Sequence, residues 1–217
     1  MKTRGIVFDF NGTLFWDTRE HNEAWFAFCG RLGVPLTQEI MFTRYHGKNN
    51  EQIFDLMFDG QRTPEQVRDY GWQKEAIYQE ICLKKGMSLA PGAERFLNML
   101  KTRNVPINVA TASGRQNVDF YYTHLGLETW FPLDRIVYND GTLPGKPRPE
   151  MYLRAMEILG LKPEETTIFE DSATGITAAE NAHVGQIVIV DSNGDDYSRW
   201  PHRVIHSFDE VFDEWNV

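Results

Sequence analysis

The chain of 217 residues is long enough to bury a substantial core, and its 41% hydrophobic and 24% charged residues are typical of a globular protein. Its 31 acidic residues outnumber 22 basic ones and give a formal net charge of −9. Nucleic acids and anionic membranes normally bind a basic surface, so we expect neither as a partner. A small anionic substrate is compatible with this charge if local cations or a metal hold it.

Targeting signals and a disulfide framework are not expected either. The N-terminal residues lack the apolar stretch of a signal peptide, and no segment approaches the roughly 18 consecutive apolar residues that span a membrane. Two cysteines in a chain of this length imply no disulfide framework. We therefore expect a cytoplasmic enzyme, and we expect it to be a monomer.

The first predicted element is a short strand over residues 6–8, Ile-Val-Phe, which is buried on both faces because it has no polar alternation. Asp9 follows it directly, and Asn11-Gly12 is a strong turn signal. In open parallel sheets, ligands bind just beyond the carboxyl ends of the strands. Taken alone, Asp9 is more simply explained as the start of a turn, so its role depends on residues that come later in the chain.

The next stretch, up to Lys85, is helix-like throughout. Apolar residues recur at spacings of three and four over residues 24–32, and Gly33 is typical of a helix end. A shorter helix is predicted over residues 51–58. The sequence Thr63-Pro64-Glu65-Gln66 has the N-cap, the first-position proline and the third-position glutamine that open a helix, which should run to about Lys85.

The rest of the chain alternates between helices and strands. We expect helices over residues 93–103, 116–125, 150–159 and 173–182, and strands over residues 105–110, 135–138, 166–169 and 186–190. This alternation indicates βαβ units, hence a parallel sheet with helices on both faces. We therefore predict an α/β fold with a three-layer, Rossmann-like parallel sheet core (residues 1–16 and 88–217) and an inserted all-helical cap domain (residues 17–87).

Polar residues stand at the ends of four predicted strands, and together they are suited to phosphoryl transfer. They are Asp9, the stretch Thr111-Ala112-Ser113-Gly114, Lys146 and the pair Glu170-Asp171. A phosphoryl group carries spread negative charge, so its transfer depends on positioning and charge neutralisation. Asp9 and Asp171 offer the hard oxygen ligands that Mg²⁺ prefers, and Lys146 offers a point charge for a phosphate oxygen.

The same residues provide a nucleophile and hydrogen-bond donors. Lys146 and the metal would counter the repulsion between the Asp9 carboxylate and the incoming anion. The carboxylate can then attack phosphorus and form an aspartyl-phosphate. Thr111 can donate a hydroxyl hydrogen bond, and we expect Ser113 and Gly114 beside it to bind the substrate. Taken singly, Lys146 would be a solvated loop lysine and Asp171 a helix N-cap. Their convergence at strand ends favours the catalytic interpretation.

Four stretches of the sequence together resemble the motifs of a known family. The stretches that carry the resemblance are Asp9-x-Asn11-Gly12-Thr13-Leu14, Thr111, Lys146 within Gly-Lys-Pro-Arg-Pro-Glu, and Glu170-Asp171-Ser172 with the Ala-Thr-Gly-Ile-Thr-Ala-Ala that follows. They are similar to the four motifs of the haloacid dehalogenase superfamily, and the helical insertion resembles its β-phosphoglucomutase-like branch. The resemblance implies a Mg²⁺ ion held by the Asp9 carboxylate, the Asn11 backbone carbonyl and the Asp171 carboxylate, with Glu170 close by.

Asn11 departs from the family pattern, in which an aspartate acts as general acid and base two residues after the nucleophile. A carboxamide can form hydrogen bonds but cannot exchange a proton. Three explanations are open: a phosphatase for substrates with good leaving groups or with a proton carrier from the cap, a protein that binds phosphorylated ligands without turnover, or a change introduced in the laboratory. Dehalogenases of the family usually have an aromatic residue at this position, so Asn11 speaks against that reaction.

The helical insertion offers further candidate substrate-binding residues. His21, followed by Ala24-Trp25, and Lys74 match positions that face the active site in sugar mutases of the family, although an exposed polar residue for His21 and a solvated helix lysine for Lys74 are the simpler alternatives. In Gly47-Lys48-Asn49-Asn50-Glu51, Asn50 stands where those mutases carry an arginine that grips a distal phosphate. Lys48 could compensate, but without the bidentate geometry of arginine.

The sequence therefore predicts a Mg²⁺-dependent phosphohydrolase that acts on a small phosphorylated metabolite through an aspartyl-phosphate at Asp9. A β-phosphoglucomutase-type sugar phosphomutase is the alternative among enzymes. A phospho-ligand-binding protein with little or no turnover is the alternative of another class. The identity of the substrate is not evident from these residues.

Overall fold

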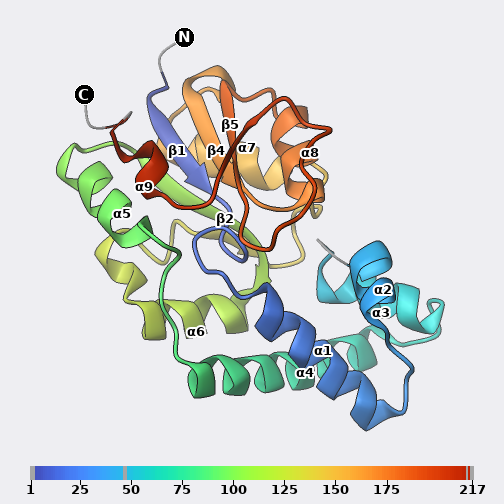
Figure 1. The fold of residues 1–217 in the computed structure, drawn as a ribbon. Helices are drawn as coiled ribbons and strands as arrows, with labels where there is room; N and C mark the ends of the chain where they lie inside the picture. Colours follow the sequence, from blue (N-terminus) through green and yellow to red (C-terminus); the bar gives the residue numbers. More distant parts are fainter. Residues whose placement is uncertain (1–2, 46–47, 214, 216–217) are drawn as a thin grey trace. The chain divides into compact units, whose positions relative to one another are not determined.

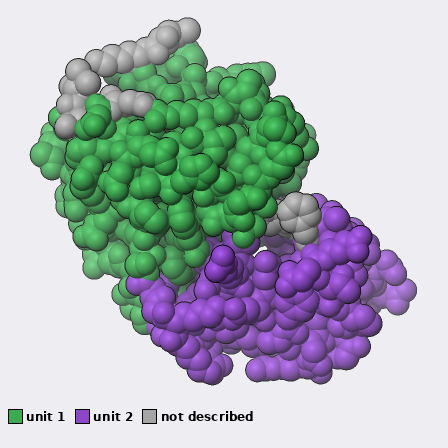
Figure 2. All heavy atoms as spheres, in the orientation of Figure 1, with its two compact units in different colours: residues 1–16, 88–217 green, residues 17–87 purple. Residues whose placement is uncertain are grey.

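A computed structural model describes residues 3–45, 48–213 and 215 of the chain. The chain divides into two compact units (Figure 2). The first, which we call the α/β unit, contains residues 1–16 and 88–217, and the second, the helical unit, contains residues 17–87.

The α/β unit contains a six-stranded sheet with strand order β3-β2-β1-β4-β5-β6, and every described pair of neighbouring strands is parallel (Figure 1). The strands are β1 (Gly5–Phe8), β2 (Ile107–Gly114), β3 (Val137–Asn139), β4 (Thr166–Glu170), β5 (Gln186–Val190) and β6 (Arg203–Ile205). The first strand lies in the middle, between β2 and β4, and all four of its residues are buried. The predicted α/β fold with a Rossmann-like parallel sheet is confirmed.

Helices cover both faces of this sheet. Successive residues of β1 point to opposite faces, so Val7 and Phe8 contact different helices. Val7 packs into a core cluster with residues of α7 (Glu150–Leu159) and α8 (Ala173–Asn181). Phe8 stacks on Phe169 with ring centroids 5.2 Å apart and meets an aromatic cluster on the other face. That cluster includes Phe96 of α5 (Ala93–Thr102) and Phe208, which precedes α9 (Asp209–Phe212). The predicted three layers are therefore present.

Some element boundaries differ from the prediction. The second strand continues to Gly114, so Thr111 to Gly114 lie within β2 and not after its end. Its pairing with β3 shifts register between Ala110 and Gly114, which lets the strand extend past the apolar stretch. The strand β6 and the helix α9 were not predicted, since they are only three and four residues long and carry no periodic pattern. The remaining elements are α6 (Arg115–Leu125) and the short 3₁₀ turns η2 (Leu127–Thr129) and η3 (Pro163–Glu165).

The helical unit contains no strand among its described residues. Its elements are α1 (Thr18–Leu32), α2 (Gln38–Ile40), a π-helical turn η1 (Met41–Tyr45), α3 (Asn50–Phe58) and α4 (Pro64–Lys85). The predicted helix signals are confirmed: Gly33 ends α1 in the left-handed conformation at φ 66°, and Thr63 caps α4. Its aromatic residues form a core, with Phe54 packed 5.2 Å from Trp25 and 5.7 Å from Phe28 between ring centroids. Within the described residues, no helix has both the length and the apolar character required to cross a membrane.

Candidate active site

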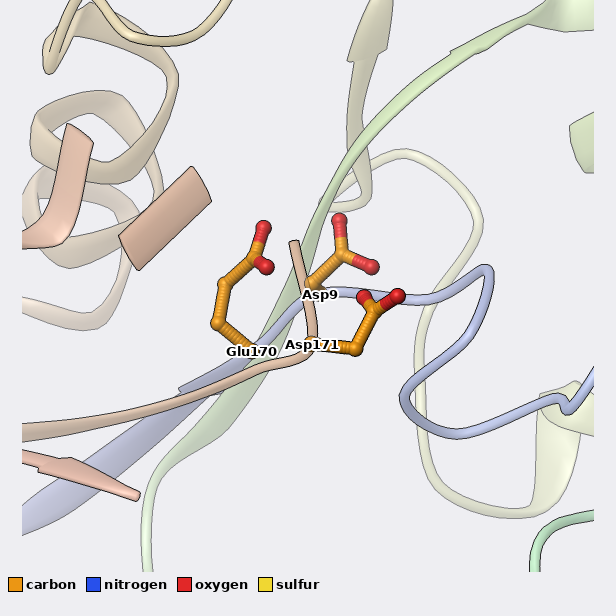
Figure 3. Close-up of side chains that lie close together, drawn as sticks. All are labelled: Asp9, Glu170 and Asp171. Carbon is orange, nitrogen blue, oxygen red and sulfur yellow. The ribbon is translucent and has the colours of Figure 1, made fainter. Parts of the chain in front are cut away.

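Three buried carboxylates meet at the carboxyl end of the sheet. Asp9 follows β1 directly, Glu170 is the last residue of β4, and Asp171 comes next. The two strands are neighbours, with Phe8 opposite Phe169, so their ends bring the three side chains together. Carboxylate oxygens of the three residues lie within 4.8 Å of one another, and Figure 3 shows the side chains converging. This is the edge of an open parallel sheet at which ligands bind.

Lys146 joins two of these carboxylates. It lies in the loop between β3 and α7, is 6% exposed, and its Nζ donates hydrogen bonds to Asp9 Oδ1 and, at 2.7 Å, to Glu170 Oε1. Burial by itself would lower the pKa of Lys146, but the Asp9 and Glu170 carboxylates outweigh burial and hold the pKa above its ordinary value. Lys146 is therefore a fixed positive charge in the site.

Glu170 is fully buried and accepts hydrogen bonds on both oxygens. Oε1 accepts from Lys146 and from the Tyr152 hydroxyl at 2.9 Å, whereas Oε2 accepts from the Ser172 backbone N–H at 2.6 Å and its hydroxyl at 3.1 Å. Gly175 of α8 leaves room for this carboxylate, because a Cβ at that position would lie 1.5 Å from Glu170 Oε1. Glu170 is therefore held by protein groups on both sides.

Asp171 is held by side chains of two other segments. The Thr13 hydroxyl donates to Asp171 Oδ1 at 3.1 Å, and the Tyr197 hydroxyl donates to the Asp171 backbone carbonyl at 2.8 Å. Burial, and then the negative charges of Glu170 and Asp9, raise the pKa of Asp171 well above its ordinary value, although Lys146 and Thr13 oppose the rise. Ionising this group is therefore unfavourable unless a further positive charge arrives.

This set of groups fits a divalent metal ion. Three carboxylates share one ammonium, which leaves an excess of negative charge in a buried site when all are ionised. Carboxylate oxygens are hard ligands of the kind that Mg²⁺ takes. The side chains of Asp9 and Asp171 would hold the ion, and both oxygens of Glu170 already accept hydrogen bonds from the protein.

Asn11 lies beside this cluster among three hydroxyl groups. Its Oδ1 accepts hydrogen bonds from Thr111 at 3.2 Å and from Ser113 at 2.8 Å. Its Nδ2 donates to the Tyr121 hydroxyl at 2.7 Å. The extension of β2 explains these contacts, since Thr111 and Ser113 lie on the strand next to β1. Gly114 ends β2 and leads directly into α6.

Comparisons with known proteins agree with this architecture. A sequence profile of haloacid dehalogenase-like hydrolases matches residues 3–183. The chain belongs to this family. The resemblance predicted from the four motifs is therefore confirmed, and the chain is a hydrolase of the haloacid dehalogenase superfamily.

Several relatives of this chain are named as phosphatases. A chloroplastic 5-amino-6-(5-phospho-D-ribitylamino)uracil phosphatase of Arabidopsis thaliana is 27% identical over 187 residues, which is 85% of this chain and 49% of that protein. The chain thus spans about half the length of that relative. A probable pseudouridine-5'-phosphatase of Drosophila melanogaster is 30% identical over 88% of this chain and 83% of its own length.

The fold is shared with solved structures of the family. The crystal structure of a HAD hydrolase, family IA, variant 3, from Entamoeba histolytica superposes with a TM-score of 0.89 at 31% identity. The match covers 99% of this chain and 97% of that one. The α/β unit and the helical unit therefore both have counterparts in a solved structure of the family.

Three of the candidate residues in the helical unit lie together. An ammonium group can only donate hydrogen bonds, so Lys74 Nζ donates to His21 Nδ1 at 3.0 Å. Lys74 Nζ also forms an ion pair with Glu75 at 2.8 Å. Asn50 Nδ2 donates to the same Glu75 oxygen at 2.6 Å. The interpretation of Lys74 as a solvated lysine is wrong: it is 1% exposed, because its neighbours include the Trp25 ring as well as Glu75.

The other side of His21 is also occupied. His21 stacks on Tyr78 with ring centroids 3.8 Å apart, and its Nε2 lies 3.4 Å from Asp17 Oδ2. The Tyr78 hydroxyl donates to the same Asp17 carboxylate. Lys48, in contrast, is exposed, and Gly47 lies outside the described residues. Of the four candidates in this unit, Lys48 is the one that the structure does not bring into the cluster.

Several residues of the site were not predicted from the sequence. Tyr152 and Tyr121 lie on the buried faces of helices, where their spacing is the same as that of ordinary core residues. Thr13 lies within the first motif, and its contact with Asp171 links two segments that are distant in the sequence. The position of Tyr152, six residues after Lys146 and at the start of α7, is the signal that could have identified it, since a side chain there returns toward the strand ends.

Proposed function

We propose that this protein is a Mg²⁺-dependent phosphatase that acts on a small phosphorylated metabolite through an aspartyl-phosphate at Asp9. The observation that carries the proposal is the contact of the Lys146 ammonium with Asp9 and Glu170, with Asp171 beside them. A nucleophilic carboxylate, a fixed cation and ligands for a metal are the parts that phosphoryl transfer requires. The phosphatases among the relatives support the same reaction class.

The reaction proceeds in two displacements. An oxygen of the Asp9 carboxylate attacks phosphorus while the bond from phosphorus to the leaving oxygen breaks, which gives an aspartyl-phosphate and the dephosphorylated product. Water then attacks phosphorus, the bond to Asp9 breaks, and inorganic phosphate leaves with the carboxylate restored. Lys146 neutralises charge on the transferred group. The hydroxyls of Thr111 and Ser113 donate to Asn11 Oδ1 and hold the Asn11 side chain in place. The side chains of Asp9 and Asp171 would hold Mg²⁺, which would supply further positive charge for the transferred group.

The leaving oxygen needs a proton unless it is stable as an anion. Asn11 cannot supply one, since a carboxamide does not exchange protons at neutral pH. Phosphates with good leaving groups, such as acyl and aryl phosphates, are therefore the preferred substrates. Sugar mutases of the family carry an arginine for a distal phosphate where this chain has Asn50, and a neutral amide does not replace that charge, which favours a hydrolase over a sugar phosphomutase.

One observation favours a second candidate, a protein that binds phosphorylated ligands with little turnover. Asn11 stands where the general acid and base is expected and is held there by three hydroxyl groups. General acid–base catalysis is typically worth about 10²–10⁴-fold, so its loss could leave binding without useful turnover. Binding would still depend on Lys146 and the metal.

A panel assay tests the proposal. Phosphate release is measured from acetyl phosphate, p-nitrophenyl phosphate and sugar phosphates, with Mg²⁺ and with a chelator. We expect Mg²⁺-dependent release that is fastest from acetyl phosphate, and a loss of more than about 10³-fold in kcat for Asp9→Asn. Asp134→Asn, which changes an exposed carboxylate of the α/β unit, is the matched control and should leave the rate unchanged.

The outcomes separate the candidate functions. Absence of phosphate release from every substrate would overturn the proposed phosphatase activity, and retained affinity for phosphorylated compounds would then support the binding protein. Conversion of β-glucose 1-phosphate to the 6-phosphate would indicate the mutase.

A further inference from the structure

Tyr152 is a fully buried residue of α7 whose hydroxyl lies in the catalytic cluster. Its side chain is 0% exposed and packs in the core between the helix and the sheet. The hydroxyl nevertheless donates a hydrogen bond of 2.9 Å to Glu170 Oε1. A phenylalanine would fill the same space, so packing alone does not require this hydroxyl.

Tyr152 and Lys146 share one acceptor. The Lys146 Nζ donates to Glu170 Oε1 at 2.7 Å, the atom that accepts from Tyr152. The same Nζ lies 4.7 Å from the centroid of the Tyr152 ring, within the range of a cation–π contact. Tyr152 therefore touches both members of the Lys146–Glu170 ion pair, one through its hydroxyl and the other through its ring.

The other oxygen of Glu170 is fixed from the opposite side. Ser172 donates to Oε2 through its backbone N–H at 2.6 Å and its hydroxyl at 3.1 Å. With Tyr152 on Oε1, the plane of the carboxylate is held at both ends. A carboxylate held in this way is a fixed hydrogen-bond acceptor for Lys146. It therefore keeps the Lys146 ammonium beside Asp9.

We propose that Tyr152 is a positioning residue for the reaction, which holds the Glu170 carboxylate and, through it, the Lys146 ammonium beside Asp9. The inference rests on the proposed function, because it assigns Lys146 to the transferred phosphate. Transition-state stabilisation by a fixed charge depends on its placement, and a displacement on the order of 1 Å can cost about 10²-fold in rate. The hydroxyl of Tyr152 thus contributes to catalysis without touching the substrate.

Tyr152→Phe tests this role, because it removes the hydroxyl and keeps the ring. We expect kcat to fall by roughly 10- to 100-fold on the best substrate of the panel, with a smaller change in KM. Inorganic phosphate, titrated by calorimetry in the presence of Mg²⁺, should bind Tyr152→Phe more weakly than the unaltered protein. This second measurement does not depend on turnover.

The matched control is Thr167→Val. Thr167 is also fully buried and lies at the other end of β4, where its hydroxyl donates to Thr3 Oγ1 at 3.1 Å. This variant loses a buried hydroxyl of the same strand layer away from the site, so it should lose stability in urea denaturation while kcat and phosphate affinity stay unchanged.

The possible results distinguish this inference from the proposed function. If the unaltered protein hydrolyses a substrate and Tyr152→Phe matches it in kcat and phosphate affinity, the positioning role is overturned and the phosphatase stands. If Tyr152→Phe loses only stability, as Thr167→Val does, the hydroxyl is structural and the inference is also overturned. If the unaltered protein releases no phosphate, the proposed function fails, and the phosphate titration alone decides for or against Tyr152.

Discussion

Asn11 is the residue at which the chemistry of this chain is most distinctive. Its carboxamide accepts hydrogen bonds from Thr111 and Ser113 and donates one to Tyr121. These three partners bond through hydroxyl groups, and a hydroxyl can either donate or accept. A carboxylate of the same shape could therefore take the place of the carboxamide if the Tyr121 hydroxyl turned from acceptor to donor.

We therefore predict that Asn11→Asp folds normally and gains catalytic power selectively. General acid help should raise kcat on alkyl phosphates, which need a proton on the leaving oxygen, by about 10²–10⁴-fold. Aryl and acyl phosphates should gain much less, because their leaving groups are stable without a proton. Steady-state kinetics of Asn11→Asp and of the unaltered protein on one alkyl, one aryl and one acyl phosphate measure the difference.

The ratio of the gains is the informative quantity. A uniform change across the three leaving groups, or a loss on all of them, would mean that Asn11 does not occupy the place of a missing acid. Acetyl phosphate acts as the internal control, since the aspartyl-phosphate can form from it without protonation of the leaving group.

How far single residues could be predicted depended on their surroundings. Asp9, Lys146 and Asp171 were predicted together, because their convergence after neighbouring strands favoured a catalytic role that none of them indicates alone, and the structure brings these three together. Tyr152 could not be distinguished from a core residue, because its side chain packs in the core, and its contacts with Glu170 and Lys146 are tertiary. Lys74 was misinterpreted because sequence does not show that Glu75 and His21 offer it partners inside the helical unit.

At the level of elements, α4 shows how a local signal determines a boundary. Thr63 Oγ1 accepts from the Gln66 N–H at 3.2 Å, and Gln66 Oε1 accepts from the Thr63 N–H at 3.0 Å. This reciprocal pair satisfies two backbone donors that the first helical turn leaves open. The helix then runs without interruption through Lys74, Glu75 and Tyr78 to Lys85.

We predict that Thr63→Ala lowers the free energy of unfolding by about 1 kcal/mol, because the cap oxygen is lost and nothing buried is disturbed. Urea denaturation followed by circular dichroism measures this loss. Thr63→Ser keeps the oxygen and should restore most of the stability. Equal losses in the two variants would show that the hydroxyl oxygen is not the source of the effect.

The contrast with β6 and α9 explains which elements sequence can define. The start of α4 is determined by four adjacent residues, Thr63 to Gln66, which form the capping box with a proline at the first helical position. The strand β6, over Arg203–Ile205, is ordered by its pairing with β5. That pairing is a tertiary interaction, and three residues contain no pattern that could predict it. The extension of β2 to Gly114 depends in the same way on its neighbour β3.

At the level of the whole molecule, the acidic cluster links stability to metal binding. In the metal-free protein the pKa of Asp171 is higher in the folded state than in the unfolded chain, owing to burial and the charges of Glu170 and Asp9. The folded state therefore binds a proton more tightly than the unfolded chain, and stability falls as the pH rises through the folded-state pKa. A divalent cation that binds only the folded state removes this penalty and adds its binding free energy.

We therefore predict that Mg²⁺ raises the melting temperature of the protein and that Asp171→Asn abolishes the effect. At a Mg²⁺ concentration 100 times the dissociation constant, the linkage is worth about 2.7 kcal/mol, which corresponds to roughly 5–10 °C for a chain of this size. With a chelator at pH 8, Asp171→Asn should melt at or above the temperature of the unaltered protein, because a neutral amide replaces a carboxylate that is costly to ionise, and its Oδ1 can still accept from Thr13. Asp134→Asn removes an exposed carboxylate and should keep the full response to Mg²⁺. Differential scanning calorimetry of the three proteins, with Mg²⁺ and with chelator, measures these shifts, and an equal Mg²⁺ response in Asp171→Asn would place the ion elsewhere.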